Sequence, residues 1–174
     1  MTPPPTTVAA DALPYRPCVG VVLFHPDGRV WAGRRTKLGN TEYSGHPKLW
    51  QFPQGGIDPG EEAEHAARRE LYEETGVSTV TLLGRTTERL RYDLPPEMIG
   101  VGLKGRYRGQ EQDWFAYRFD GNESEIRIQP PPDGHKPEFD AWEWTSLAAM
   151  PERVVPFKRA IYEALARDFA WFAA

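Results

Sequence analysis

The sequence predicts an α/β protein in which a mixed β-sheet packs between helices. Two observations support this. Short β-branched or aromatic runs alternate with glycine- and proline-rich turns along most of the chain. Two segments, one in the middle and one at the end, have helical periodicity instead. Strands interleaved with two helices fit a layered α/β sandwich.

Length and composition predict one compact domain. The chain has 174 residues, of which 40% are hydrophobic and 26% charged, as in an ordinary globular protein. We expect a disordered tail at residues 1–13, where prolines and threonines dominate, and one domain at residues 14–174. The net charge of -4 excludes a broadly basic surface that coats nucleic acid.

The N-terminal region and the one cysteine indicate where in the cell the protein is expected. Cys18 lacks an intramolecular disulfide partner, and its apolar neighbours predict a buried thiol in a strand. The chain lacks both a secretory signal pattern and an apolar stretch of the roughly 20 residues that span a bilayer. We therefore expect a cytoplasmic protein without membrane contact.

The first elements are a hairpin and a long loop. An apolar run at residues 17–24, a His-Pro-Asp-Gly turn and a second run at residues 29–32 predict two antiparallel strands. The polar, glycine-punctuated segment Thr36–Lys48 predicts a loop long enough to be functional. A short strand-like run, Leu49–Phe52, follows it.

A helix is predicted at Pro59–Thr75. Asp58 is a candidate N-cap, Pro59 fits the first helical position, and Glu61 lies three residues after the cap. Gly76 is a natural helix stop. The remaining chain predicts a stiff loop at residues 130–132. Further strands are predicted at Val80–Leu83, Thr86–Tyr92, Asp113–Arg118 and Phe139–Thr145, and a final helix at Pro156–Phe172.

The middle helix carries the residues that suggest chemistry. Glu70, Glu73 and Glu74 stand at positions i, i+3 and i+4, so they share one face. Each residue of a helix turns by about 100°. On that basis Glu70 and Glu74 continue the side of small residues Ala63, Ala66 and Ala67, whereas the opposite side carries Glu64, His65, Arg68 and Tyr72.

A solvated acidic stripe is the common explanation for neighbouring glutamates. Here, however, the glutamates continue the small, sheltered face, where like charges are costly unless a cation neutralises them. Oxygen ligands suit hard cations such as Mg²⁺ or Mn²⁺, and Mg²⁺ is often held jointly by carboxylates and substrate phosphates. We therefore expect a phosphate-containing substrate and no organic cofactor. The four histidines show no paired ligand spacing, so we expect no zinc site.

The spacing of this region resembles the complete Nudix box. Five residues separate Gly55 from Glu61, and seven separate Glu61 from the run Arg-Glu-Leu-Tyr-Glu-Glu-Thr-Gly-Val at residues 69–77. The resemblance implies a Nudix-like α/β/α sandwich and a pyrophosphohydrolase. Outside the box, six further segments are similar to bacterial RNA pyrophosphohydrolases, a group within this family. They are residues 15–17, 50–54, 91–92, 112–115, 137–139 and 157–159.

Those relatives imply roles for the box residues and their neighbours. Metal ligands would be Gly55, through its carbonyl, Glu70, Glu73, Glu74 and Glu138. Glu74 is the preferred general base, with Glu138 as the alternative. Arg69 is either a surface arginine or the group that orients Glu61 and Glu73, and the family pattern favours the second role.

The resemblance also implies substrate contacts. Arg16, Arg35 and Lys158 would face the polyphosphate, Val155 and Phe157 would contact a base, and Gln54 and Tyr92 would lie near the site. Phe157 fits a core position equally well. A basic cluster, Lys104, Arg106 and Arg108, either guides RNA or is merely solvated.

The leading hypothesis is an RNA 5′ pyrophosphohydrolase that converts 5′-triphosphate or diphosphate RNA ends to monophosphates. The alternative within the family is an asymmetric diadenosine tetraphosphate hydrolase, because the box handles only metal and phosphate. A non-catalytic nucleotide sensor or a structural protein with an acidic helix would not need the full set of glutamates. The segment Thr36–Lys48 is longer than in enterobacterial relatives and bears on substrate preference, and the sequence identifies no activating protein.

Overall fold

The computed structural model describes residues 9–36 and 49–173. Within them, eight strands form one sheet in the order β3-β2-β1-β7-β5, with β4 paired to β1, β6 to β7 and β8 to β2. The strands are β1 (Tyr15–Phe24), β2 (Val30–Arg35), β3 (Trp50–Gln51), β4 (Gln54–Gly56), β5 (Val80–Arg85), β6 (Leu90–Asp93), β7 (Gly109–Phe119) and β8 (Phe139–Thr145).

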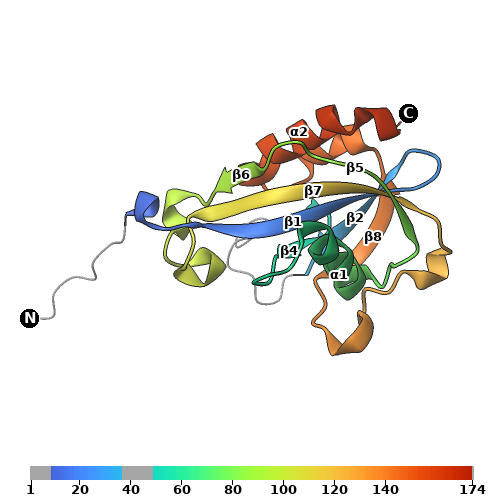
Figure 1. Cartoon of the computed structure of the whole chain (residues 1–174), viewed down its shortest axis with the longest axis horizontal. Helices are drawn as coiled ribbons and strands as arrows, with labels where there is room; N and C mark the ends of the chain where they lie inside the picture. Colours follow the sequence, from blue (N-terminus) through green and yellow to red (C-terminus); the bar gives the residue numbers. More distant parts are fainter. Residues whose placement is uncertain (1–8, 37–48, 174) are drawn as a thin grey trace, which may run out of the picture.

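The centre of the sheet is a long parallel pair. Strands β1 and β7 run side by side from the pair Tyr15 and Gly109 to the pair Phe24 and Arg118, whereas β2, β4, β5, β6 and β8 pair antiparallel. Helix α1 (Ala63–Thr75) covers one face, and α2 (Arg159–Asp168) covers the other (Figure 1). The mixed sheet between helices confirms the predicted α/β/α sandwich.

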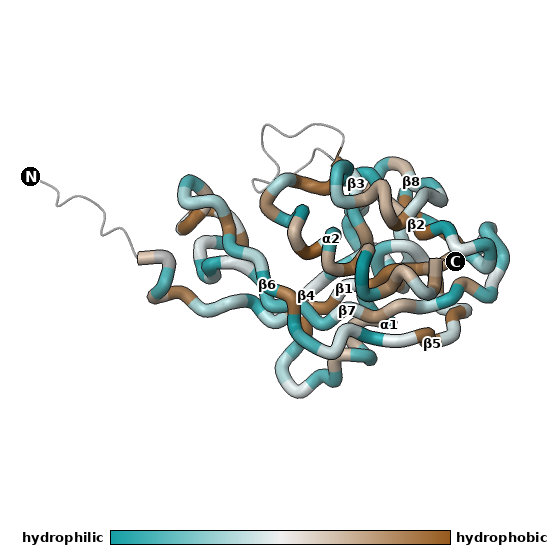
Figure 2. Tube along the Cα trace, turned by 90° about the horizontal axis from the view of Figure 1, so that it is seen from above, coloured by the Kyte–Doolittle hydropathy of each residue, from teal (hydrophilic) through white to brown (hydrophobic). Residues whose placement is uncertain are grey.

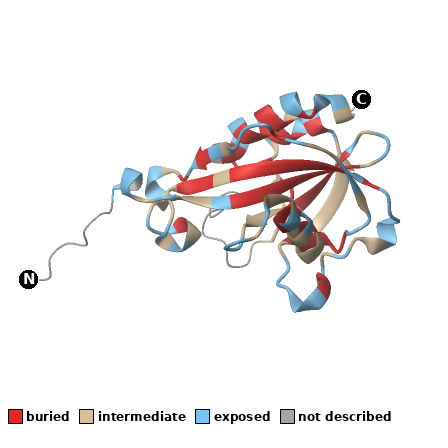
Figure 3. Cartoon of the chain, in the orientation of Figure 1, coloured by how far each residue is buried: buried red, intermediate tan, exposed pale blue. Residues whose placement is uncertain are grey.

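Each face of the sheet has its own apolar core. Val19, Val21 and Phe115 pack with Ala66 and Leu71 of α1. On the α2 side, the core comprises Val22, Phe24, Phe52, Trp114, Tyr162 and Leu165, among others. Buried residues follow the central strands and the inner sides of both helices (Figure 3). The loops at the periphery are mainly hydrophilic (Figure 2).

The predicted hairpin is present, and Cys18 is buried in β1 as expected. Residues 1–8 of the predicted tail lie outside the described residues, and Ala10–Ala12 form a short 3-10 helix. The segment Thr36–Lys48 lies outside them too, apart from Thr36. No helix in the described part of the chain is long and apolar enough to cross a membrane.

The predicted start of the middle helix is wrong by one turn. The helix begins at Ala63, after a turn in which the Glu61 amide donates to the Asp58 carbonyl at 3.0 Å. Gly60 has φ +78° in this turn, a left-handed conformation that cannot continue a right-handed helix. The predicted C-terminus is confirmed, because Gly76 also has φ +78° and its amide caps the Tyr72 carbonyl at 2.8 Å.

Three other predicted boundaries differ from the structure. The strand expected at Thr86–Tyr92 is wrong for its first half, because β7 is long enough to pair first with β5 and then, after a bend, with β6. Residues 54–56, for which no strand was predicted, form β4 against β1. The final helix is shorter than expected: Pro156–Lys158 and Ala170–Ala173 are 3-10 turns on either side of α2.

Candidate active site

Helix α1 brings its carboxylates to the edge of the sheet. Ala66 and Ala67 are buried against β1 and β7, and two turns later Glu74 is also buried, with 7% of its surface exposed. The Gln54 amide of β4 donates to Glu74 Oε2 at 3.2 Å. The helical periodicity that predicted a sheltered face therefore places Glu74 inside the protein.

Gly55 allows Glu70 to approach β4. A β-carbon at this position would overlap the Glu70 carboxyl group. The register pairs Gly55 with Val19 of β1, so the backbone of β4 is fixed to the central sheet. A glycine here is therefore required by the close approach of a carboxylate to the strand.

Arg69 holds a compact cluster of acidic groups. Its guanidinium donates to Glu61 at 2.7 and 2.8 Å, to Glu70 at 2.9 Å, to Glu73 at 3.1 Å and to the Gly56 carbonyl at 2.9 Å. These hydrogen bonds to Arg69 lower the pKa of Glu61 to about 2. The Arg69 side chain therefore ties the loop before α1 to the helix and to β4.

A pocket of about 300 Å³ opens beside this cluster. Three carboxylates and two arginines face it from β1, β2, α1 and the loop before β8. The lining residues are Arg16, Arg35, Gln54, Gly55, Gly56, Glu70, Glu74, Leu103, Gln110 and Glu138. The pocket therefore joins most of the predicted metal ligands to two of the predicted phosphate contacts.

Burial and mutual repulsion disfavour the charged form of two pocket carboxylates. Burial raises the pKa of Glu70 to about 7, despite the contact with Arg69. Burial also raises the pKa of Glu74 well above its ordinary value, and repulsion from Glu138 and Glu70 adds to the shift. In both cases the environment disfavours the carboxylate form unless further positive charge is supplied.

Arg35 supplies part of that charge. A bulge at Arg34 and Arg35 interrupts the pairing of β2 with β8. The Arg35 guanidinium lies 3.2 Å from Glu138, and the Thr36 amide donates to the Glu138 carbonyl at 3.0 Å. This contact holds the residue before β8 beside the α1 carboxylates.

The donor set fits a divalent cation of the hard, oxygen-binding class. Buried carboxylates with raised pKa are the groups that such a cation would stabilise. Among residues 9–36 and 49–173, no three His, Cys, Asp or Glu side chains form a ready-made metal centre. Glu73 is instead bonded to Arg69, and Glu138 to Arg35.

The predicted substrate contacts fall into two groups. Arg16, Arg35 and Gln54 line the pocket. The other four, Tyr92, Val155, Phe157 and Lys158, lie together on the α2 side. Val155 is fully buried, the Tyr92 and Phe157 rings are 5.5 Å apart, and Lys158 Nζ lies 5.3 Å from the Tyr92 ring. The structure therefore does not bring this second group into the pocket.

Sequence reasoning missed three lining residues: Gly56, Leu103 and Gln110. Gln110 alternates with Gln112 and Trp114, a pattern that could have indicated one polar face of a strand. Leu103 sits in the 3-10 segment Gly102–Gly105 with φ +53°, which local sequence gives no reason to expect.

The histidines and the basic loop are scattered. His25 pairs with Asp27, His65 with Glu61, and His135 Nε2 lies 3.8 Å from Glu73, whereas the fourth, His46, is outside the described residues. In the basic cluster, Lys104 and Arg106 are exposed. Arg108 binds Asp93 at 3.0 Å and stacks on Tyr15. The three basic residues therefore do not act as one open patch.

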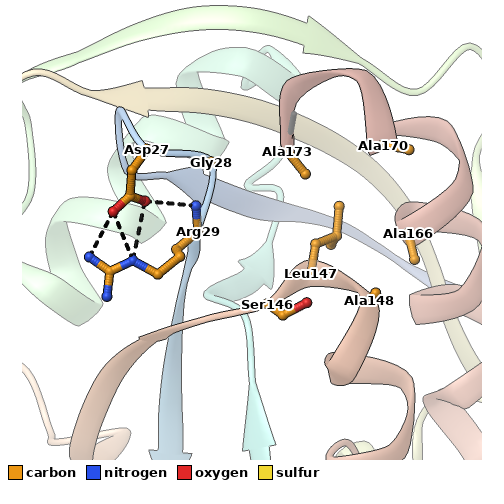
Figure 4. Close-up of a pocket in the computed structure, with 9 residues that line it drawn as sticks. All are labelled: Asp27, Gly28, Arg29, Ser146, Leu147, Ala148, Ala166, Ala170 and Ala173. Carbon is orange, nitrogen blue, oxygen red and sulfur yellow. Dashed lines mark hydrogen bonds and ion pairs between the residues drawn. The ribbon is translucent and has the colours of Figure 1, made fainter.

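A second pocket, of about 270 Å³, lies between the β1–β2 turn and the C-terminal helical turns (Figure 4). Its charged residues, Asp27 and Arg29, bind each other at 2.9 Å, and three alanines, Ala166, Ala170 and Ala173, form much of its wall. It has no cluster of acidic groups, and the chemistry therefore concentrates in the pocket at α1.

Comparison with known proteins agrees with this geometry. Residues 14–165 match the model of the NUDIX domain. The chain is 60% identical to the RNA pyrophosphohydrolase of Agrobacterium fabrum over 163 residues, which cover 94% of this chain and 96% of that protein. It is 57% identical to the RNA pyrophosphohydrolase of Rhizobium meliloti, covering 94% and 98%.

Solved structures agree at the level of the fold. The E. coli dihydroneopterin triphosphate pyrophosphohydrolase matches with a TM-score of 0.62 at 19% identity, covering 89% of this chain and 99% of that one. At this identity the similarity concerns the arrangement of strands and helices, which is the arrangement predicted from the sequence.

Proposed function

The chain belongs to the NUDIX family, and from that membership we propose that it is an RNA 5′ pyrophosphohydrolase that depends on divalent cations. It would convert 5′-triphosphate or diphosphate RNA ends to monophosphates. The observation that carries this proposal is the pocket in which Glu70, Glu74 and Glu138 face Arg16 and Arg35. The similarity to RNA pyrophosphohydrolases over 94% of the chain supports RNA as the substrate.

The cation would be held by carboxylates of the pocket. Glu70, Glu74 and Glu138, with the Gly55 carbonyl, are the proposed ligands, and Glu73 would complete the set predicted from the sequence. Mg²⁺ or Mn²⁺ fits these oxygen donors. When bound, such a cation neutralises phosphate charge and lowers the pKa of a bound water.

The pocket side chains would accept the proton of the attacking water and stabilise the charge on the phosphate. In hydrolysis the water oxygen forms a bond to phosphorus while a bridging P–O bond breaks and pyrophosphate or phosphate leaves. Glu74 is the preferred acceptor for the proton of the water, and Glu138 is the alternative. Arg16 and Arg35 would stabilise the charge that develops on the phosphate oxygens.

Arg69 acts on the site through its contacts and not as a catalytic residue. It fixes Glu61, Glu70 and Glu73 to one guanidinium and thereby sets the position of α1 against β4. Its loss would displace two of the proposed ligands at once. A cytoplasmic location is consistent with Cys18 as a buried thiol.

The substrate is tested by a direct competition. Purified protein with Mg²⁺ or Mn²⁺ is given 5′-triphosphorylated RNA or diadenosine tetraphosphate, and kcat/KM is measured for each. We expect a much higher value for RNA. A higher value for the dinucleotide would make the protein a dinucleoside polyphosphate hydrolase, and no hydrolysis of either substrate would support a non-catalytic sensor.

A further inference from the structure

Three glutamines and a tryptophan form a buried chain of hydrogen bonds beside the pocket. Gln110, Gln112 and Trp114 occupy alternate positions of β7, so they share one face of the sheet. Their exposed fractions are 3%, 1% and 0%. Gln54 of β4 joins them from across β1. Buried side-chain amide groups generally require hydrogen-bond partners.

The direction of this chain is fixed by the tryptophan. An indole N–H can only donate a hydrogen bond. Trp114 Nε1 lies 2.9 Å from Gln112 Oε1, so this oxygen must be the acceptor and the Gln112 nitrogen must face the other way. No reversal of the Gln112 amide would satisfy the indole.

The fixed amide of Gln112 then sets the direction of its two neighbours. Its NH₂ group donates to Gln54 Oε1 at 3.1 Å and to Gln110 Oε1 at 2.8 Å. Both hydrogens are used. Gln54 and Gln110 must therefore both present their oxygens to Gln112, and their own NH₂ groups are turned away from it.

Both NH₂ groups belong to residues that line the pocket. In the part of the chain that the structure describes, neither side-chain nitrogen has a hydrogen-bond partner. Gln110 is the register partner of Arg16 on the neighbouring parallel strand. The Gln54 backbone amide donates to Glu74, which connects the same residue to the carboxylate side of the pocket.

We propose that Gln112, anchored by Trp114, is a positioning residue that turns the Gln54 and Gln110 NH₂ groups toward the pocket, where they donate to phosphate oxygens of the substrate. This inference rests on the proposed function. Phosphate oxygens only accept hydrogen bonds, so two outward NH₂ groups attract them, whereas the reversed amides would present two repelling carbonyl oxygens. Because the amides are neutral, they add donors beside Arg16 without repelling a cation at the carboxylates.

A purely structural network would behave differently when it is broken. If the glutamines only satisfied one another, loss of Gln112 would lower stability and leave substrate affinity unchanged. If Gln112 sets the direction of the two amides, its loss allows them to reverse, and binding weakens in a protein that still folds.

The principal test is Gln112→Met, which keeps the length of the side chain but removes its hydrogen bonds. We expect KM for 5′-triphosphorylated RNA to rise about tenfold with kcat changed by less than about threefold. Trp114→Phe removes the anchoring donor and should raise KM in the same way. Thr86→Val is the matched control, because Thr86 Oγ1 accepts from the Trp114 backbone amide at 3.2 Å and is not part of the pocket.

The control variant shows whether a disturbance of β7 alone raises KM, or whether the rise requires that the Gln54 and Gln110 amide groups lose their orientation. Thr86→Val should lower the melting temperature and leave KM unchanged. An unchanged KM in a folded Gln112→Met variant, or an equal rise in Thr86→Val, would overturn the proposal. If Gln112→Met does not fold, Trp114→Phe is judged by the same comparison.

A binding measurement does not depend on turnover. The side-chain amide signals of Gln54 and Gln110 are followed by ¹⁵N NMR while inorganic pyrophosphate is added with Mg²⁺. We expect both signals to shift in the wild-type protein and to shift less in Gln112→Met. Absence of any shift in the wild type would overturn the inference. Failure of the wild type to hydrolyse RNA would instead reject the proposed function, and the NMR result would still decide the role of the amides.

Discussion

Arg69 and Arg35 each face a group of carboxylates, but the balance of charge around them differs. Arg69 lies within hydrogen-bonding distance of Glu61, Glu70 and Glu73 and also binds a backbone carbonyl. Its strongest partner, Glu61, has a pKa lowered to about 2, so this part of the site is stable as an ion pair. The Arg35 guanidinium lies 3.2 Å from Glu138 and also acts electrostatically on Glu74.

On the Arg35 side the glutamates are under-neutralised. Glu74 is buried beside Glu138 and Glu70, and its pKa is raised by burial and by their charges. The comparison separates two uses of acidic residues within one motif. Glu61 serves to position Arg69 and α1, whereas Glu74, whose charged form is disfavoured, is suited to bind a cation, and Glu70 contacts both Arg69 and the pocket.

The largest expected effect comes from the under-neutralised side. Glu74→Gln should lower kcat by about 10³-fold or more, because it removes both a proposed ligand and the preferred base. Without added metal the variant should be at least as stable as the wild type, since it replaces a buried carboxyl group whose charged form is disfavoured. Turnover and thermal melting measure the two effects.

The matched control for this change is Glu64→Gln. Glu64 lies on the outer side of the same helix, pairs with Arg68 at 3.4 Å and is 43% exposed. It should keep full activity. Equal losses in the two variants, or a Glu74→Gln protein that retains activity, would contradict the assignment of Glu74 to the site.

The Arg69 side should respond in stability as well as in activity. Arg69→Met leaves Glu61 and its neighbours without their shared cation in a partly buried place, and we expect a loss of about 3 kcal/mol in the free energy of unfolding. Arg68→Met, which breaks an exposed pair, should cost less than about 1 kcal/mol. Urea denaturation of both variants compares them, and similar losses would mean that Arg69 is an ordinary surface arginine.

A smaller effect is expected from pH. The folded pKa of Glu70 is about 7, above its ordinary value of 4.5. For an acid with a raised folded pKa, stability is full below the unfolded pKa and is lost as pH rises through the folded one. We expect metal-free protein to lose on the order of 2–3 kcal/mol between pH 5 and pH 8.

Two comparisons sharpen the pH prediction. Glu70→Gln should reduce the slope between pH 5 and pH 8, with the remainder due to Glu74, and Mg²⁺ should restore stability to the wild type at pH 8 because it favours the carboxylate form. Glu61 has the opposite sign, so its contribution is lost only as pH falls from about 4.5 toward 2. An unchanged slope in Glu70→Gln would show that another group titrates.

Local patterns predicted much of this site. Helical periodicity alone placed Glu74 on the buried face of α1, and glycine chemistry identified the end of the helix at Gly76. The start of the helix was missed because Gly60 adopts a turn conformation that competes with the capping pattern. Caps and turns draw on the same residue types, so sequence alone does not separate them here.

The remaining errors depend on contacts between distant segments. The hydrogen bond from the Gln54 amide to Glu74 was not predicted, because it follows from how α1 lies on β4. The amide chain around Gln112 requires the register of β7 with β1, and Tyr92 meets Phe157 only after α2 has packed on the sheet. These contacts join segments that are far apart in the chain, so no local sequence pattern predicts them.

The most direct test of the account is a calorimetric titration of Mn²⁺ into metal-free protein at pH 7, repeated in buffers of different ionisation enthalpy. If the buried carboxylates form the cation site, the wild type should bind Mn²⁺ and release protons, because Glu70 and Glu74 must become carboxylates. Glu74→Gln should bind far more weakly, and Glu64→Gln should match the wild type. Equal binding by wild type and Glu74→Gln would contradict the account.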